Sequence, residues 1–412
     1  MRWHSMEGGG AFCSVFLMKG NAIPMSNSST FDKVGCVDFV YAGMRKKGGE
    51  TMVGMRDVAK KAGVSLSTVS LVVNKTGYVS DDMRSRVETA MKELNYVPNE
   101  LARNLYKNRT NLVGVIVPTI RHPFFSTLTA HLQHELAAHG LRTMLCSTAD
   151  AENGEAEYVD MLRRRMMDGI IVCSHTTHPN DYWTSIDRPV VAFDRVLGDG
   201  IASIGSDHEQ GGRLMAHMLI NTGTRHVVMV GGPREQFFDL ASKSGGDPDD
   251  FDLHKTTFPT IRYYLTLEQE LKAAGVRYEY VEAGNVQDFQ GYKGAVNDVL
   301  NRMQTDGIDA VVSSDIGAAL CVREALRRNI SIPHDLQVIA YDGTYLTDLA
   351  GIRMTAVAQD FEKIAQVAVG HIVRAIAQSG EGGAGAQQED GRKPYEPSVL
   401  IPVTLKLGDT TR

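Results

Sequence analysis

The sequence predicts two kinds of structure, a small all-α helix-turn-helix head followed by an α/β body of two parallel-sheet lobes. The head is predicted by two short helical stretches with a glycine between them, in residues 55–80. The body is predicted by apolar strands that alternate with amphipathic helices from residue 111 onward. The alternation comes in two successive series, and each series predicts one lobe. At 412 residues the chain is long enough for this organisation.

The charge is divided unevenly along the chain. Residues 52–110 hold ten Lys and Arg against six Asp and Glu, a net charge of +4, which leaves −10 for the rest of a chain whose total is −6. A basic head on an acidic body favours binding of phosphate groups by the head. No apolar run has the length of a membrane span, so no membrane partner is expected.

The cysteines are odd in number and scattered, and no C-x-x-C pair occurs among them. This pattern predicts neither a disulfide framework nor a zinc site, and it fits buried free thiols in a reducing cytoplasm. We expect no metal and no cofactor. The five are Cys13, Cys36, Cys146, Cys173 and Cys321.

Residues 1–54 show no sustained periodicity and are rich in Gly, Ser and Met. The apolar stretch 11–18 resembles a signal peptide only faintly, because three glycines separate it from Arg2 and His4. We interpret the segment as a disordered extension or as the product of a start codon set too early. In the second case Met52 or Met55 is the true beginning.

The head is predicted over residues 55–98. Gly63 stands where the first helix needs a left-handed cap, and Ser65 is a good N-cap for the second helix. Ser80 caps a third helix. The apolar stripe of that third helix, which should pack in a three-helix core, comprises Met83, Val87, Met91 and Leu94. Pro98 ends it, and residues 99–110 form a short further helix.

The body is predicted over residues 111–412. Its first series has strands at 112–117, 141–146, 169–173 and 190–194, with helices after the first two. Its second series has strands at 226–232, about 276–281, 309–314 and 336–342, and helices at 209–220, 262–274, 290–302 and 317–328. A last strand, VLIPVTLKL, follows a polar linker over 378–397. The segment 233–261 holds four phenylalanines and either roofs a ligand cleft or forms a surface loop.

The run DVAKKAGVSLSTVSLVVN, followed by GYVS and by a helix ending in ELNYVPN, resembles the headpiece of the LacI/GalR (lactose-repressor) family. The resemblance continues through nearly all of residues 55–407. It implies a body with the periplasmic-binding-protein fold, whose two lobes close on a ligand. It also implies that residues 99–110 are a hinge helix that forms on operator DNA.

The resemblance implies which residues contact DNA. Leu66 and Ser67 occupy the base-reading positions of the family motif, and Leu71 stands where the family usually has Arg. Arg reads guanine through two hydrogen bonds and Leu does not, so the operator sequence is left open. In the hinge, Leu105 matches a family Leu that is inserted into the minor groove. The full expected set is Ser65, Leu66, Ser67, Thr68, Ser70, Leu71, Asn74, Tyr78, Ala102 and Leu105.

The expected effector site lies at the carboxyl ends of strands, where parallel α/β sheets bind ligands. The HPFF motif (122–125) follows the first strand, and in relatives its aromatic rings stack on the ligand. Charged side chains at other strand ends can bind sugar hydroxyls. Phe124 or Phe125 could equally be core, and Asp342 could instead cap a lobe crossover. The expected set is Phe124, Phe125, Asp194, Arg195, Arg262, Asp315 and Asp342.

The sequence therefore predicts a cytoplasmic, homodimeric transcription regulator that binds double-stranded operator DNA and a small-molecule effector. We expect a repressor of a carbohydrate-utilisation operon that is released by a sugar. One alternative is a repressor that needs a purine-type corepressor. Another, from a different class, is a solute-binding protein of a transporter, which the head disfavours. No nucleophile and base are paired in a recognisable motif, so we do not expect an enzyme.

Overall fold

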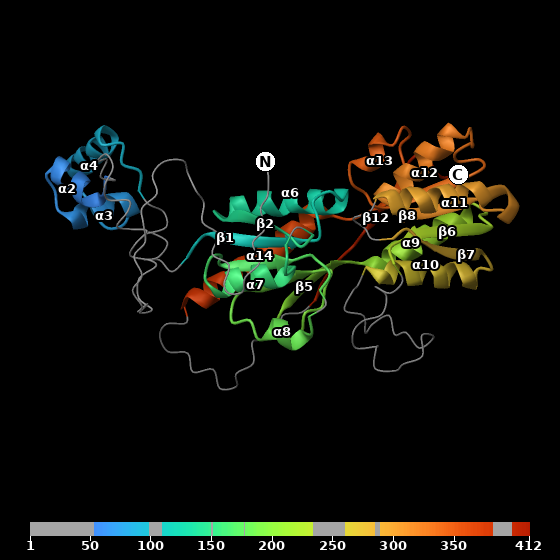
Figure 1. Ribbon diagram of the computed structural model, residues 1–412, viewed down its shortest axis with the longest axis horizontal. Coiled ribbons are helices and arrows are strands. Elements are labelled where there is room, and N and C mark those ends of the chain that lie inside the picture. The colour runs from blue at the N-terminus through green and yellow to red at the C-terminus, as the bar shows by residue number, and fades with distance from the viewer. Residues whose placement is uncertain are drawn as a thin grey trace, which may run out of the picture. The chain divides into compact units, whose positions relative to one another are not determined.

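The computed structural model describes residues 53–98, 109–149, 151–176, 178–233, 260–284, 289–381 and 398–412. The chain divides after Pro98 into two compact units, a head and a body (Figure 1). The hinge residues Ala102 and Leu105, the extension before residue 53 and most of the segment 233–261 lie outside the described residues.

The head is a three-helix unit of α2 (Met55–Ala62), α3 (Leu66–Asn74) and α4 (Asp81–Glu93). Val58, Val69 and Val87 are completely buried between the helices. The predicted caps are confirmed, since Ser65 accepts from the N–H of Thr68 and Ser80 from that of Met83. Met83, in the first turn of α4, is 43% exposed, so the buried stripe of this helix begins one turn later than predicted.

Lobe 1 is built on a six-stranded parallel sheet in the order β11-β5-β4-β3-β1-β2. Helices α6 and α14 cover one face, and α7 and α8 cover the other (Figure 1). The strands are β1 (Leu112–Val117), β2 (Arg142–Ser147), β3 (Gly169–Val172), β4 (Val190–Phe193), β5 (Ala202–Ser206) and β11 (Val399–Ile401). The helices are α6 (Pro123–Ala138), α7 (Glu155–Arg163), α8 (Asn180–Thr184) and α14 (Phe361–Glu381). Burial on both faces explains why the central strands are continuous apolar runs.

Lobe 2 repeats the plan with the order β12-β10-β9-β8-β6-β7, in which only β12 runs antiparallel to its neighbour. Helices α9 and α10 pack on one face of this sheet, and α11 and α12 on the other. The strands are β6 (His226–Gly231), β7 (Arg277–Glu282), β8 (Ala310–Ser314), β9 (Gln337–Asp342), β10 (Thr355–Ala358) and β12 (Thr404–Lys406). The helices are α9 (His208–Asn221), α10 (Ile261–Ala273), α11 (Phe289–Asp306), α12 (Asp315–Arg327) and α13 (Leu346–Leu349).

In the part of the chain that the structure describes, three segments pass from one lobe to the other, and we call them the crossovers. They join β5 to α9, β10 to α14, and β11 to β12. The third one corrects the sequence analysis, which predicts a single last strand, VLIPVTLKL. Pro402 has no N–H to donate to a sheet, and the segment leaves the sheet of lobe 1 there and enters the sheet of lobe 2.

Candidate functional site

The turn between α2 and α3 fixes the angle at which the second helix leaves the first. Gly63 has a φ of 65°, the left-handed conformation that glycine adopts without strain. A Cβ at this position would lie 2.8 Å from Nη2 of Arg86, which reaches over from α4. The Arg86 guanidinium donates to the carbonyl oxygens of Ala62, at 2.7 and 3.1 Å, and of Gly63, at 3.1 Å. The turn is thus held by a charged group from the third helix.

The residues expected to contact DNA within the head are exposed or partly exposed. Val69 and Val72 bury the inner face of α3, while Leu66 and Leu71 on the outer face are 44% and 36% exposed. Tyr78, in the loop after α3, is 92% exposed. Ser65 and Ser67 are also exposed, and Thr68, Ser70 and Asn74 are partly exposed. The outer face of α3 is therefore free within the head to meet a groove of DNA.

The HPFF motif begins α6 directly after the first strand of lobe 1. Phe124 is 8% exposed and packs against Phe193 and Phe361, with ring centroids 5.9 and 5.5 Å away. Phe125 is only partly buried and meets Phe124 edge-on. The structure therefore places Phe124 in the core of lobe 1 and leaves Phe125 as the more accessible ring.

His122 caps the same helix through its ring. Its Nδ1 accepts from the N–H of Phe124 at 3.3 Å, and burial lowers the pKa of this histidine to about 4. In the unfolded chain a histidine takes up its proton near pH 6.5. The unfolded state therefore binds more protons than the folded state between about pH 6.5 and 4, and lobe 1 loses stability as the pH falls through this range.

Replacing His122 by asparagine, which keeps an acceptor for the Phe124 N–H, should reduce this loss. Thermal unfolding of the wild type and of His122→Asn at pH 7 and pH 5 measures the effect. The drop in melting temperature between the two pH values should be smaller in the variant. His334→Asn, at an exposed position, is the control and should behave as the wild type. Equal drops in all three proteins would show that the imidazole of His122 becomes charged in the folded protein.

Asp194 and Arg195 follow β4 and are both buried. Asp194 has a φ of 47°, in the left-handed region of backbone conformation. Its Oδ1 accepts from the N–H of Ser206 at 3.2 Å, and its Oδ2 lies 3.0 Å from Nε2 of His208. The Arg195 guanidinium donates to carbonyl oxygens at the ends of β3 and β4, including that of Ser174 at 2.8 Å. The pair thus ties neighbouring strand ends together.

Asp315 and Asp342 occupy the corresponding edge of lobe 2. Asp315 is 1% exposed and accepts from the N–H groups of Gly343 and Thr344, at 3.1 and 2.6 Å, and from the Thr344 hydroxyl. Burial raises the pKa of Asp315 to about 6 and that of Asp342 well above its usual value. Asp342 Oδ1 accepts from Nε2 of Gln359 at 2.9 Å, which agrees with the expectation that Asp342 could cap a crossover.

The structure brings together most of the expected effector residues at the carboxyl ends of the strands. The polar atoms of these side chains also form hydrogen bonds to neighbouring strand ends and loops. The same side chains therefore fix the shape of the sheet edge that a ligand would meet. Arg262 is partly buried in the first turn of α10, and the hydrogen bonds given above are made without it. Binding of a ligand by these residues remains a prediction.

At the carboxyl ends of the lobe 1 strands, the sequence analysis missed the buried carboxylate of Glu155. Glu155, at the start of α7, is 7% exposed, and burial raises its pKa. Its Oε2 accepts from the Ser174 hydroxyl at 3.4 Å, and its Oε1 lies 4.0 Å from Nε2 of His178. Ser174 and His178 follow β3, and the Ser174 carbonyl oxygen also accepts from Arg195. No motif in the sequence links these residues to Glu155. The carboxylate adds a polar group to the edge of lobe 1.

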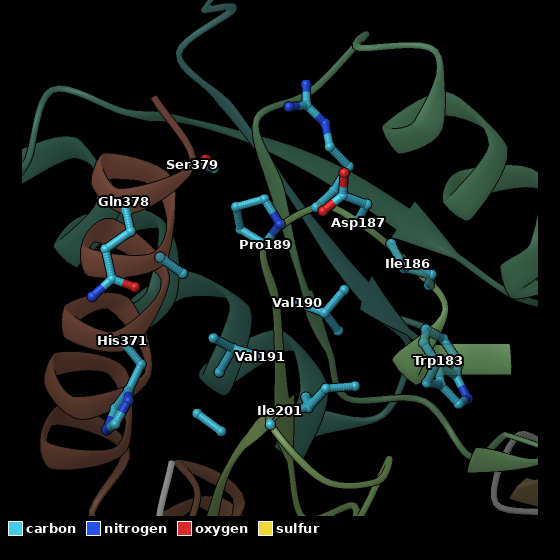
Figure 2. A pocket seen from close by; sticks show the side chains of 14 residues that line it. Trp183, Ile186, Asp187, Pro189, Val190, Val191, Ile201, His371, Gln378 and Ser379 are labelled. Carbon is cyan, nitrogen blue, oxygen red and sulfur yellow. The ribbon is translucent and has the colours of Figure 1, made fainter. Parts of the chain in front are cut away.

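A cavity of about 290 Å³ lies at the opposite end of the strands of lobe 1 (Figure 2). Figure 2 shows His371, Gln378 and Ser379 along α14, across from Pro189 and Val190 at the start of β4. It is separate from Asp194, which follows the last residue of that strand. Among the described residues, no group of three His, Cys, Asp or Glu could hold a metal ion, and no helix is long and apolar enough to cross a membrane.

Comparison with protein families gives three matches along the chain. Residues 54–99 match the family described as bacterial regulatory proteins, lacI family. Residues 110–244 match periplasmic binding proteins and sugar binding domain of LacI family, and residues 216–411 match a periplasmic binding protein-like domain.

Individual relatives and solved structures agree with these matches. The sucrose operon repressor of Streptococcus mutans is 32% identical over 356 residues, 86% of this chain and 98% of the relative. The ribose operon repressor of Bacillus subtilis is 33% identical over 293 residues, 71% of this chain and 82% of the relative. The lac repressor dimer bound to operator and the anti-inducer ONPF is similar in fold, with a TM-score of 0.69 at 22% identity over 88% of this chain and 99% of that one.

Proposed function

The chain belongs to the LacI family of bacterial regulatory proteins, and from that premise we propose that it represses a carbohydrate-utilisation operon until a sugar releases it from the operator. The observation that carries the proposal is the joining of a helix-turn-helix head to a two-lobed body whose lobes are linked by three crossovers. The head recognises a DNA sequence, and the body senses the small molecule. Such a regulator acts where its operator lies, in the cytoplasm. We assign it no catalytic step.

We propose that the outer face of α3 enters the major groove. Leu66 and Ser67 face the base edges, and the hydroxyls and amide of Thr68, Ser70 and Asn74 contact the backbone or bases beside them. Two heads read a palindrome, so the protein works as a homodimer, and the hinge residues Ala102 and Leu105 add the minor-groove contact. The net charge of +4 over residues 52–110 supports the attraction to phosphates.

We propose that the effector binds between the lobes, at the carboxyl ends of the strands. Phe125 offers an accessible ring, and the edges that hold Asp194 and Asp315 supply the polar groups. The sugar class is supported by the family match of residues 110–244 and by relatives named as sucrose and ribose operon repressors. Closure of the lobes on the sugar would alter how the body presents the two hinge segments to DNA.

The experiment that tests the function is a titration of the protein on its operator with sucrose and with ribose. We expect one of them, or a related sugar, to weaken operator binding, with a typical coupling of 5–150-fold. By reciprocity, operator DNA must weaken binding of that sugar by the same factor. A purine that tightens operator binding would replace the inducer mechanism by the corepressor mechanism.

Light scattering at micromolar concentration should give the mass of a dimer, because two heads are needed to read a palindrome.

Leu71 should determine part of the operator sequence. Replacing it by arginine places a guanidinium on the outer face of α3, where it can donate two hydrogen bonds to guanine, a discrimination of about 1–3 kcal/mol. Binding selections with both proteins should therefore show a shift toward a G·C pair at one symmetric position in the Leu71→Arg variant. Identical consensus sites would show that residue 71 does not meet the base edges.

A further inference from the structure

A buried polar bridge connects two of the crossovers. Ser206 ends β5 in lobe 1, and Gln359 follows β10 in lobe 2. The Ser206 hydroxyl donates to Oε1 of Gln359 at 2.6 Å, and the two residues are 1% and 6% exposed. Because the two residues belong to strand ends of different lobes, this bond depends on how the lobes are placed.

The other end of the Gln359 amide is bound as well. Its Nε2 donates to Oδ1 of Asp342 at 2.9 Å, and its backbone N–H donates to the Asp342 carbonyl oxygen at 3.0 Å. One planar side chain therefore spans from the end of β9 in lobe 2 to the end of β5 in lobe 1. Because the amide geometry is fixed, a rotation of one crossover against the other changes at least one of these bonds.

A second link runs beside the first and involves Asp194. Its carboxylate lies against the ring of His208, the first residue of α9 in lobe 2. Nδ1 of His208 is 2.6 Å from the hydroxyl of Tyr341, whose ring stacks on Tyr263 with centroids 3.7 Å apart. Asp194 also accepts from the N–H of Ser206, so both links meet at the residue that the sequence analysis expects in the effector site.

We propose that Gln359 is a positioning residue that sets the angle between the two lobes and thereby transmits effector binding to the rest of the protein. A buried polar group without a partner is costly, so the amide favours the lobe arrangement in which both ends are bonded. The ligand-free protein then holds one arrangement, and a ligand shifts it by replacing these bonds. The transmission of the signal rests on the proposed function, whereas the control of the lobe angle does not.

The lobe angle is measured without any ligand by the distance between spin labels on the two lobes. The labels are attached through Arg164→Cys after α7 and Arg327→Cys in α12, which are exposed positions of lobe 1 and lobe 2. In the described residues the native cysteines are buried, and the chain without the two substitutions is labelled in parallel as background. The full chain is used throughout.

Gln359→Ala removes both bonds of the amide and should broaden the distance distribution or give a second population. Ser206→Ala removes only the bond between the lobes and should give a smaller change of the same kind, and it serves if Gln359→Ala does not fold. The matched control is Gln337→Ala. Gln337 is also buried, but its amide donates to Thr222 and Thr224 within lobe 2. This control should lower the melting temperature and leave the distance distribution unchanged.

Unchanged distributions in both Gln359→Ala and Ser206→Ala would overturn the inference, as would a broadening of the same size in Gln337→Ala. With sucrose or ribose, whichever acts on the wild type, the fold-change in operator affinity should fall toward one in Gln359→Ala. A wild type that responds to neither sugar, beside altered distances in the variants, would count against the sugar assignment and support the positioning role. A variant with altered distances and an unaltered response would refute the transmission step.

Discussion

An Asp315→Ala variant is expected to lose its response to the effector and to be less stable by about 3 kcal/mol or more even without ligand. The carboxylate accepts from three donors of Gly343 and Thr344 in a buried place. An unpaired buried donor costs roughly 1–3 kcal/mol, so the loop after β9 would be released from the end of β8. Chemical denaturation and an operator titration with sugar measure the two effects.

Two further variants make this result specific. Asp315→Asn keeps one acceptor oxygen and should lie between the wild type and the alanine variant. Asp348→Ala removes an exposed carboxylate from α13 and should change neither property. If Asp315→Ala loses the response and keeps its stability, Asp315 acts only by contacting the ligand. If the variant keeps both its response and its stability, Asp315 neither binds the effector nor stabilises the loop after β9.

A Gly63→Val variant is expected to abolish specific operator binding. The left-handed backbone at Gly63 costs roughly 1–2 kcal/mol for a residue with a Cβ, and more for a β-branched one. The new Cβ would also displace the Arg86 guanidinium, which binds the carbonyl oxygens of the turn. A unit as small as the head has little stability in reserve, so the two penalties together should unfold it.

The matched control is Gly54→Val, just before α2. Gly54 has an extended backbone with a φ of −112°, and a Cβ there meets its nearest atom only at 3.8 Å. Gel-shift titration should show wild-type affinity for this variant and no specific complex for Gly63→Val. The melting transition of the body should be the same in all three proteins. Specific binding by Gly63→Val would show that the turn tolerates a side chain.

The regular elements follow closely from patterns of neighbouring residues. The apolar run 112–117 is β1, and the predicted helix over 209–220 is α9, His208–Asn221. These patterns are local, since burial on both faces gives a continuous apolar strand and burial on one face gives helical spacing. The last strand was predicted wrongly because apolarity alone does not show that Val399–Ile401 and Thr404–Lys406 pair with different sheets.

The sequence predicts where the residues of the candidate site lie in the fold, but it does not predict which groups form hydrogen bonds with them. The position of Asp194 and Asp315 at strand ends follows from the alternation of strands and helices, because parallel strands end at one edge. Their partners come from distant parts of the chain or from backbone groups. Ser206, Gln359 and the N–H groups of Gly343 and Thr344 carry no pattern that would reveal these hydrogen bonds.

The three crossovers also determine when each lobe is completed during synthesis of the chain. Lobe 1 begins with β1 at Leu112. It is complete only when α14 has covered its sheet and β11, which ends at Ile401, has joined the edge of that sheet. Lobe 2 lies almost entirely between β5 and α14 of lobe 1, and its last strand, β12, ends at Lys406. A nascent chain thus makes most of lobe 2 while the apolar face that α14 covers on lobe 1 is still open. Folding of the body must therefore wait until α14, β11 and β12 have been synthesised, which makes long-range pairing its slow step and chaperone binding most useful before that point.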